Sequence, residues 1–172
     1  MRTLALIVLA LFIGVAPASA WDEYKYPDQA VAIQFPAKPT AMKSTYKSIL
    51  AKDLPSMVFS AELDNVIYRL TVIDLGANAA KGSSFVNEAG NQLMRQGKVT
   101  FWDFPLLIEK SVFGVTLVVD RKDGGRVVSS FYDYQGRLYI PEAVVLPARG
   151  DKDMTTPTRF VQTIRFLPDS FN

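Results

Sequence analysis

The chain has 172 residues, of which 49% are hydrophobic, and its 19 lysine and arginine side chains nearly balance 17 aspartate and glutamate side chains. A net charge of +2, with signs that alternate along the chain, argues against a nucleic-acid-binding protein, which normally carries a basic face. The chain contains no histidine and no cysteine. This composition excludes disulfides and thiol chemistry, removes the usual general base, and leaves us expecting neither a cofactor nor a metal site.

The first 20 residues have the layout of a cleavable signal peptide. Arg2 precedes an apolar run at residues 4–15, and Ala18-Ser19-Ala20 forms a small-residue cleavage pattern. The run is too short to span a bilayer, which takes about 20 apolar residues. We therefore expect one domain at residues 21–172, with no integral membrane segment after cleavage. The compact leader favours the periplasm of a Gram-negative bacterium.

Strand patterns open the expected domain. Residues 24–26 and the alternating residues 31–35 flank the turn-forming pair Pro27-Asp28, which predicts a hairpin. A second strand-rich stretch covers residues 42–74 and contains the turn pair Asp64-Asn65. The short connection predicts antiparallel pairing.

A helical pattern follows a small-residue loop expected at residues 76–82. Ser84 is the expected N-cap, Glu88 is expected in the first turn, and Gly97 is expected to end the helix. Gly90 would lie inside the helix, which suggests close contact with a sheet. The apolar face consists of Phe85, Val86, Ala89, Leu93 and Met94.

Strand patterns then dominate until a short helix near the end of the chain. The expected strands are residues 99–104, 106–108, 112–120, 126–134 and 137–146. For the final helix, Thr156 is the expected N-cap and Pro157 the first helical residue, with Phe160, Ile164 and Leu167 on one face. Hairpins rather than crossovers predict an α+β fold, with a largely antiparallel β-sheet covered by two helices.

Three short segments support a resemblance to a known group of proteins. They are Phe35-Pro36-Ala37-Lys38-Pro39, the hairpin Tyr134-Gln135-Gly136-Arg137-Leu138-Tyr139, and the terminal segment from Arg159-Phe160 to Arg165-Phe166-Leu167. With this element order, the chain resembles bacterial exported proteins of the PsbP-like alpha-beta-alpha sandwich group. The resemblance implies a non-catalytic accessory or binding module and brings no shared catalytic residues.

An aromatic segment at residues 101–104 supplies the candidate ligand site. In a strand, Trp102 and Phe104 face one way, while Phe101 and Asp103 face the other. Trp102 and Phe104 would either belong to the core or line an apolar groove for a lipid, peptide or glycan, together with tyrosines from a neighbouring strand. The candidate ligand-binding residues are Trp102, Phe104, Tyr132 and Tyr134.

The favoured hypothesis is therefore an exported, non-catalytic binding module of the bacterial envelope that binds an envelope protein or an apolar small ligand. Two alternatives stay open. One is a small serine hydrolase, because Ser44 and Lys47 have Ser-x-x-Lys spacing, although a strand would point the two side chains to opposite faces. The other is a structural subunit of an envelope complex.

Overall fold

Two antiparallel sheets of unequal size organise the residues that this computed structural model describes, which are 21–107, 112–149 and 153–168. The predicted signal peptide lies outside these residues. The large sheet has, in spatial order, β3 (Thr40–Tyr46), β4 (Leu54–Leu63), β5 (Val66–Asp74), β10 (Arg137–Val145), β9 (Arg126–Tyr134), β8 (Val112–Arg121) and β6 (Gly97–Asp103), and β7 (Leu106–Leu107) pairs with β8. The small sheet has the order β1 (Asp22–Tyr26), β2 (Val31–Phe35) and β11 (Arg165–Phe166).

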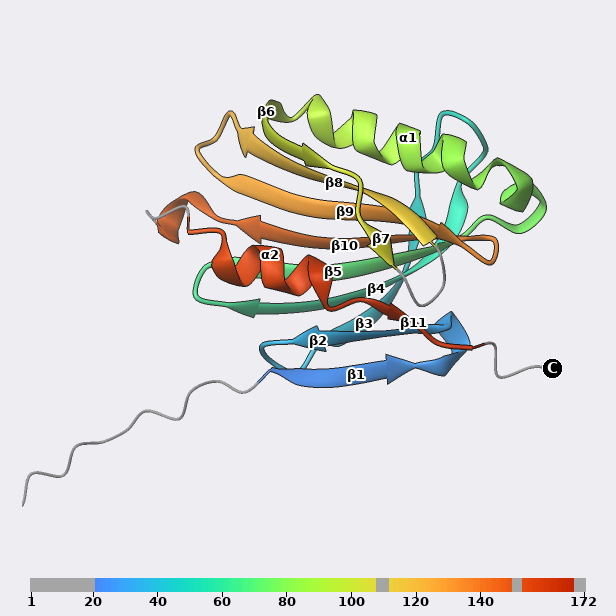
Figure 1. Cartoon of the computed structure of the whole chain (residues 1–172), viewed down its shortest axis with the longest axis horizontal. Helices are drawn as coiled ribbons and strands as arrows, with labels where there is room; N and C mark the ends of the chain where they lie inside the picture. Colours follow the sequence, from blue (N-terminus) through green and yellow to red (C-terminus); the bar gives the residue numbers. More distant parts are fainter. Residues whose placement is uncertain (1–20, 108–111, 150–152, 169–172) are drawn as a thin grey trace, which may run out of the picture.

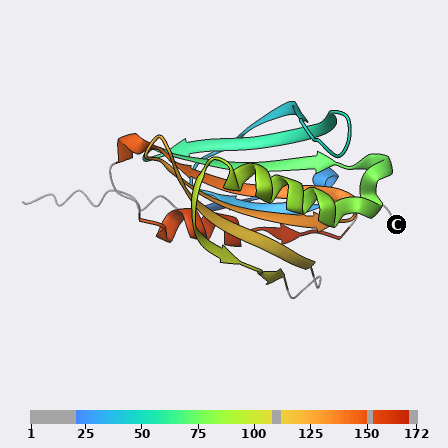
Figure 2. The same ribbon diagram turned by 90° about the horizontal axis from the view of Figure 1, so that it is seen from above.

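The two helices, α1 (Gly82–Met94) and α2 (Thr155–Gln162), pack on opposite faces of the large sheet (Figure 1). We call these the α1 face and the α2 face. On the α1 face, α1 contacts β6, β8, β9 and β10 and leaves the side of β4 uncovered (Figure 2). On the α2 face, α2 and the small sheet pack side by side. The predicted α+β fold, with a largely antiparallel sheet covered by two helices, is confirmed.

Each face of the large sheet has its own hydrophobic core. Under α1, Phe85 and Leu93 of the helix pack with strand residues such as Leu117 and Phe131. On the α2 face, Phe160 of α2 packs with residues of the small sheet and of β4, β5 and β10. Alternation along each strand supplies both cores, since successive side chains point to opposite faces.

The predicted tight turns are present. Asp64 and Asn65 both have positive φ, 52° and 57°, and join β4 to β5. Gln135 and Gly136, with φ of 48° and 72°, join β9 to β10 in the same way. Two consecutive left-handed residues match the right-handed twist of the flanking strands.

The start and the end of α1 differ from those predicted. The helix begins at Gly82, after a 3-10 helix at Gly76–Lys81 in place of the expected loop, so Ser84 is not the N-cap. It ends at Met94, and Gly97 is the first residue of β6. Glu88 lies in the middle of α1 rather than in its first turn, and it is buried.

The final helix is shorter than expected. Met154, not Thr156, is the N-cap, and the helix ends at Gln162. The chain then leaves the helix because β11 completes the small sheet, where Phe166 lies opposite Val31 of β2. Ile164 is still buried, but between helix and strand rather than on a helical face.

Candidate functional site

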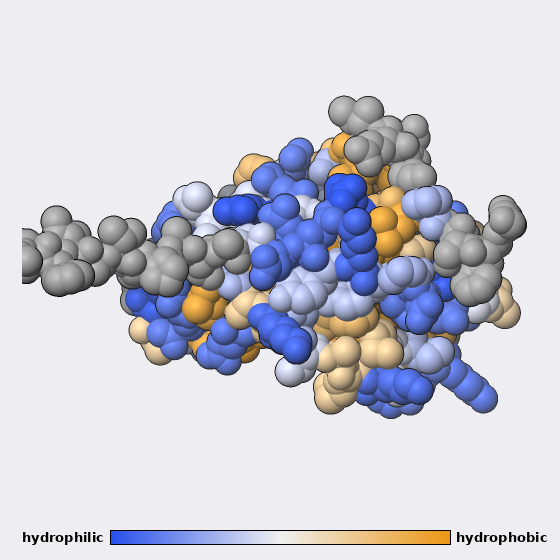
Figure 3. Space-filling view, turned by 90° about the horizontal axis from the view of Figure 1, so that it is seen from below, coloured by the Kyte–Doolittle hydropathy of each residue, from blue (hydrophilic) through white to orange (hydrophobic). Residues whose placement is uncertain are grey.

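A groove lies on the α2 face between α2 and the strands β6, β8 and β9, and we call it the α2 groove. Its volume is about 480 Å³, within the range of small-molecule sites. The apolar lining residues are Phe101, Pro105, Val118, Val128, Tyr132, Met154 and Val161. The polar ones are Thr100, Asp103, Thr116, Arg126, Ser130, Thr158 and Gln162. Figure 3 shows this side of the molecule, where hydrophobic patches are separated by hydrophilic surface.

Strand register directs the apolar side chains into the groove. Val118 lies opposite both Val128 of β9 and Phe101 of β6, so the three share a face. In a regular strand Val99 and Phe101 would also share a face, but the register shifts between them. This irregularity leaves Val99 packed in the core under α1 and turns Phe101 onto the α2 face.

A glycine makes room for the largest groove side chain. Gly114 lies opposite Tyr132, and a Cβ at this position would lie 2.2 Å from the tyrosine ring. The ring can therefore lie across β8, where only 2% of Tyr132 is exposed. Burial raises the pKa of Tyr132, while the nearby Ser130 hydroxyl acts in the opposite direction. The phenol is thus a neutral part of the groove wall.

Most polar groups of the groove are already engaged. The Thr116 and Ser130 hydroxyls lie 2.6 Å apart and hydrogen-bond to each other. Arg126 donates to both carboxylate oxygens of Asp120, at 3.0 Å from Nη2 to Oδ2, and this hydrogen bonding raises the pKa of the guanidinium. Asp103 differs from Arg126 in that none of the residues that the structure describes forms an ion pair or hydrogen bond with its carboxylate.

The structure does not bring the four predicted site residues together. Tyr132 lines the α2 groove, whereas Trp102 lies opposite Leu117 of the core under α1 and so faces the other way. Tyr134 stacks on Phe166 of β11, with 4.5 Å between the ring centroids. Phe104 lies beside Trp102, with centroids 5.8 Å apart. The expectation of a single groove lined by all four is wrong in geometry, because β6 presents Trp102 away from Tyr132.

Phe101 was not among the residues predicted to bind a ligand, although strand alternation placed it on the opposite face from Trp102. Phe101 and Asp103 do share a face, opposite Val118 and Thr116, and both line the α2 groove. The strand alternation therefore already indicated that Phe101 and Asp103 lie on one face. What the sequence could not supply was which of the two faces α2 would leave partly open.

Apolar side chains also gather at one corner of the large sheet, at the end of β6 and in the β7 and β8 hairpin. Trp102, Phe104 and Phe113 are 54%, 66% and 71% exposed. Trp102 and Phe104 were expected either in the core or in a groove. They are neither core residues nor part of the α2 groove, and we call them, with Leu106 and Phe113, the aromatic corner.

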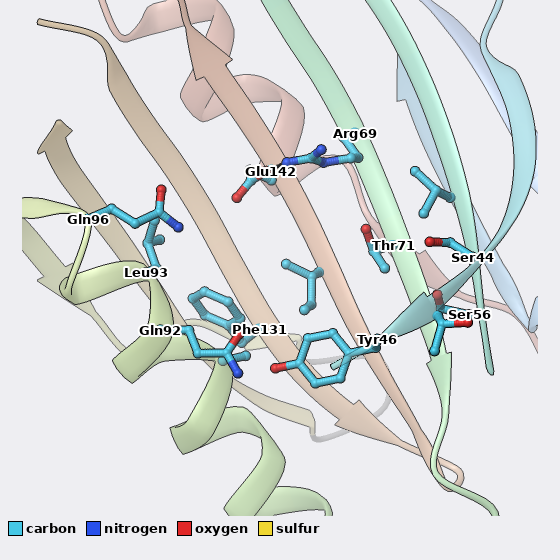
Figure 4. Close-up of a pocket in the computed structure, with 14 residues that line it drawn as sticks. Ser44, Tyr46, Ser56, Arg69, Thr71, Gln92, Leu93, Gln96, Phe131 and Glu142 are labelled. Atoms are coloured by element: carbon cyan, nitrogen blue, oxygen red, sulfur yellow. Dashed lines mark hydrogen bonds and ion pairs between the residues drawn. The ribbon is translucent and has the colours of Figure 1, made fainter. Parts of the chain in front are cut away.

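A second, polar hollow lies on the α1 face beside α1, with a volume of about 230 Å³. Figure 4 shows Ser44 and Ser56 on neighbouring strands, Thr71 and the Arg69 and Glu142 ion pair on the next two, and Gln92 and Gln96 from α1. The arginine and the glutamate neutralise each other. This hollow is the uncovered half of the α1 face.

The proposed hydrolase pair is not arranged for proton transfer. Ser44 lies in β3 and lines the polar hollow, and Lys47 comes directly after that strand. The Lys47 amine forms an ion pair with Asp53. Among the described residues, no hydrogen bond joins this amine to the Ser44 hydroxyl.

Neither a metal site nor a membrane-spanning helix is found within residues 21–107, 112–149 and 153–168. No group of three or more aspartates and glutamates there could hold a metal ion. No helix in the same ranges is long and apolar enough to cross a bilayer.

Comparisons with known proteins bear on the fold. No protein-family model matches the chain, and no curated protein matches it in sequence. The chain is similar to the solution structure of cyanobacterial PsbP (CyanoP) from Synechocystis sp. PCC 6803, with a TM-score of 0.52 over 89% of this chain and 95% of that one. The chain has a PsbP-like fold. At 14% sequence identity, the PsbP-like similarity concerns the arrangement of helices and strands and not the residues of the α2 groove.

Proposed function

We propose that this chain is an exported, non-catalytic binding module whose α2 groove holds a small, mostly apolar ligand. The observation that carries the proposal is the groove itself, where valines from β8, β9 and α2 and two aromatic rings line a volume of about 480 Å³. Burial of apolar ligand surface against such a wall is favourable by about 25 cal/mol per Å². A few polar groups at the rim would orient the ligand.

The chemistry of the groove suits binding better than catalysis. The Thr116 and Ser130 hydroxyls are hydrogen-bonded to each other, and the Arg126 guanidinium is hydrogen-bonded to Asp120. The whole chain has no imidazole and no thiol, which are the side chains most used as bases and nucleophiles near neutral pH. The PsbP-like fold supports the same reading, as an analogy of architecture.

Export to the periplasm is part of the proposal and rests on residues 1–20. The leader has one early cation, an apolar run and a small-residue cleavage pattern. An apolar ligand is poorly soluble in water, so a carrier in an aqueous compartment of the envelope would have a physical purpose.

A protein partner is a second candidate, and the aromatic corner favours it. Trp102, Phe104 and Phe113 are more than half exposed and lie close together, and exposed apolar patches of this kind often mark interaction sites. Gentle crosslinking in cells would then capture a stoichiometric partner, and Phe113→Ser would abolish its capture.

Native mass spectrometry of protein purified gently from the periplasm tests ligand binding. We expect monomer together with a heavier species that carries a non-protein adduct. Thr100→Phe should remove the adduct by filling the groove, because Thr100 lines it. Thr40→Phe is a matched control: both threonines are exposed, lie on the two edge strands of the large sheet, and donate to a carbonyl of the neighbouring strand. Bare monomer alone, with no adduct after exposure to envelope lipid extract, would contradict the proposal.

A further inference from the structure

The charges along the α2 groove distinguish among apolar ligands. Among the described residues that line it, Asp103 and Arg126 are the two that carry a charge. Asp120 holds Arg126 through two hydrogen bonds, so this cation is neutralised within the protein. Asp103, in contrast, has no partner among the residues that the structure describes. The groove therefore presents one uncompensated negative charge.

The position of that charge matters as much as its sign. Asp103 is the last residue of β6, the edge strand, and is exposed at the rim, while the valines and Tyr132 lie deeper. Phe101 is two residues away on the same face of the strand. A cation at the rim would be attracted by the carboxylate.

We propose that the ligand of the α2 groove is a small amphiphile with an apolar body and a protonated amine as its head, with the amine at Asp103 and the body along Val118, Val128 and Val161. This inference rests on the proposed function, because it names the class of ligand for the same groove. A carboxylate head would meet the like charge of Asp103, and a hydroxyl head would gain little from it. Fatty acids are therefore disfavoured relative to amines of the same length.

Three probes with the same apolar chain separate the preference for an amine head from the binding of apolar ligands by the α2 groove. Octylammonium, octanol and octanoate are titrated into the purified protein at low ionic strength, and affinities are measured by isothermal titration calorimetry. Because Asp103 is exposed, a charge contact there is modest, so we expect octylammonium to bind roughly threefold more tightly than octanol. Octanoate should bind more weakly than octanol by a similar factor. The preference should shrink as salt is added.

Two variants assign the preference to Asp103. Asp103→Asn should abolish the difference in affinity between octylammonium and octanol. Asp22→Asn removes the same charge from an exposed strand residue that does not line the groove, and it should keep the preference. Equal affinity for the three probes in the unmodified protein, or a preference that survives Asp103→Asn, overturns the inference while the groove still binds. If none of the probes binds, the proposed function itself fails.

Discussion

The Tyr46 hydroxyl is a buried polar group without a hydrogen-bond partner among the described residues. Burial raises the pKa of Tyr46 to about 12, and the negative charge of Glu88 adds to this rise. Gln92 lies near the hydroxyl and acts in the opposite direction, but no hydrogen bond of good geometry joins them. A buried polar group left unpaired costs about 1 to 3 kcal/mol, so the Tyr46 hydroxyl lowers the stability of the fold.

Removing the hydroxyl should therefore not harm the protein at neutral pH. We expect Tyr46→Phe to leave the free energy of unfolding unchanged or to raise it by about 1 kcal/mol. The folded pKa of about 12 lies above the ordinary tyrosine value of 10.0, so the folded state favours the neutral phenol. The stability linked to this preference is fully present below pH 10 and is lost as the pH rises toward 12. Urea denaturation across this range should show a smaller alkaline loss for Tyr46→Phe than for the unmodified protein. A variant that is clearly less stable at neutral pH would mean that the hydroxyl has a partner.

At the scale of elements, Glu88 of α1 binds the connection between β3 and β4 through hydrogen bonds. Its carboxylate accepts hydrogen bonds from the Ser48 hydroxyl at 2.7 Å and from the Ile49 amide at 2.6 Å, as well as from Gln92 one turn later at 3.2 Å. Only 5% of Glu88 is exposed. A buried carboxylate is tolerated when hydrogen bonds replace its hydration. These bonds attach the segment to α1 together with the hydrogen bond that Gln92 donates to the Lys47 carbonyl.

Truncation of Glu88 should loosen that segment. We expect Glu88→Ala to lower the free energy of unfolding by about 1 to 3 kcal/mol, because it removes the buried carboxylate that accepts these hydrogen bonds, and to speed hydrogen exchange at the Ile49 amide. Glu62→Ala is the control, since Glu62 is exposed on β4 and surface changes usually fall within about 0.5 kcal/mol. Equal stability of the two variants would show that Glu88 does not hold the connection.

Local patterns predicted the strands and turns but not the features that depend on distant residues. The start of α1 depends on Asp133 of β9, since a Cβ on Gly82 would lie 1.9 Å from that carboxyl carbon. No residue near Ser84 in the sequence indicates this contact with β9. In the same way, the hydrogen bonds of Glu88 come from residues 39 and 40 positions away, and β11 forms because β2 is beside it. Phe101 was placed on the correct side of its strand, but the site also needed the position of α2.

On the scale of the whole molecule, the large sheet separates two environments. The α1 face carries the polar hollow with its neutral Arg69 and Glu142 pair, and the α2 face carries the apolar groove. Both lie beside a helix that covers only part of its face. The PsbP-like arrangement therefore leaves a hollow on each face of the large sheet. The central claim of the proposal is that the apolar α2 groove binds a ligand.

The expected signal peptide makes a prediction about the whole chain. Cleavage after Ala20 would leave Trp21 as the first residue, and Trp21 already packs against Tyr68 and lies 4.7 Å from the Arg159 guanidinium. Intact-mass analysis of protein from the periplasm should therefore give a chain that starts at Trp21. A mass that includes Met1 would contradict both cleavage and the proposed location.

Methyl NMR spectra during a titration with octanol test the use of the α2 groove most directly. The account predicts saturable shifts for the methyl groups of Met154, Val118 and Val161, which line the groove, and none for those of Leu93 and Ile140 in the polar hollow. Shifts confined to the hollow, or no saturable shift in either place, would contradict it.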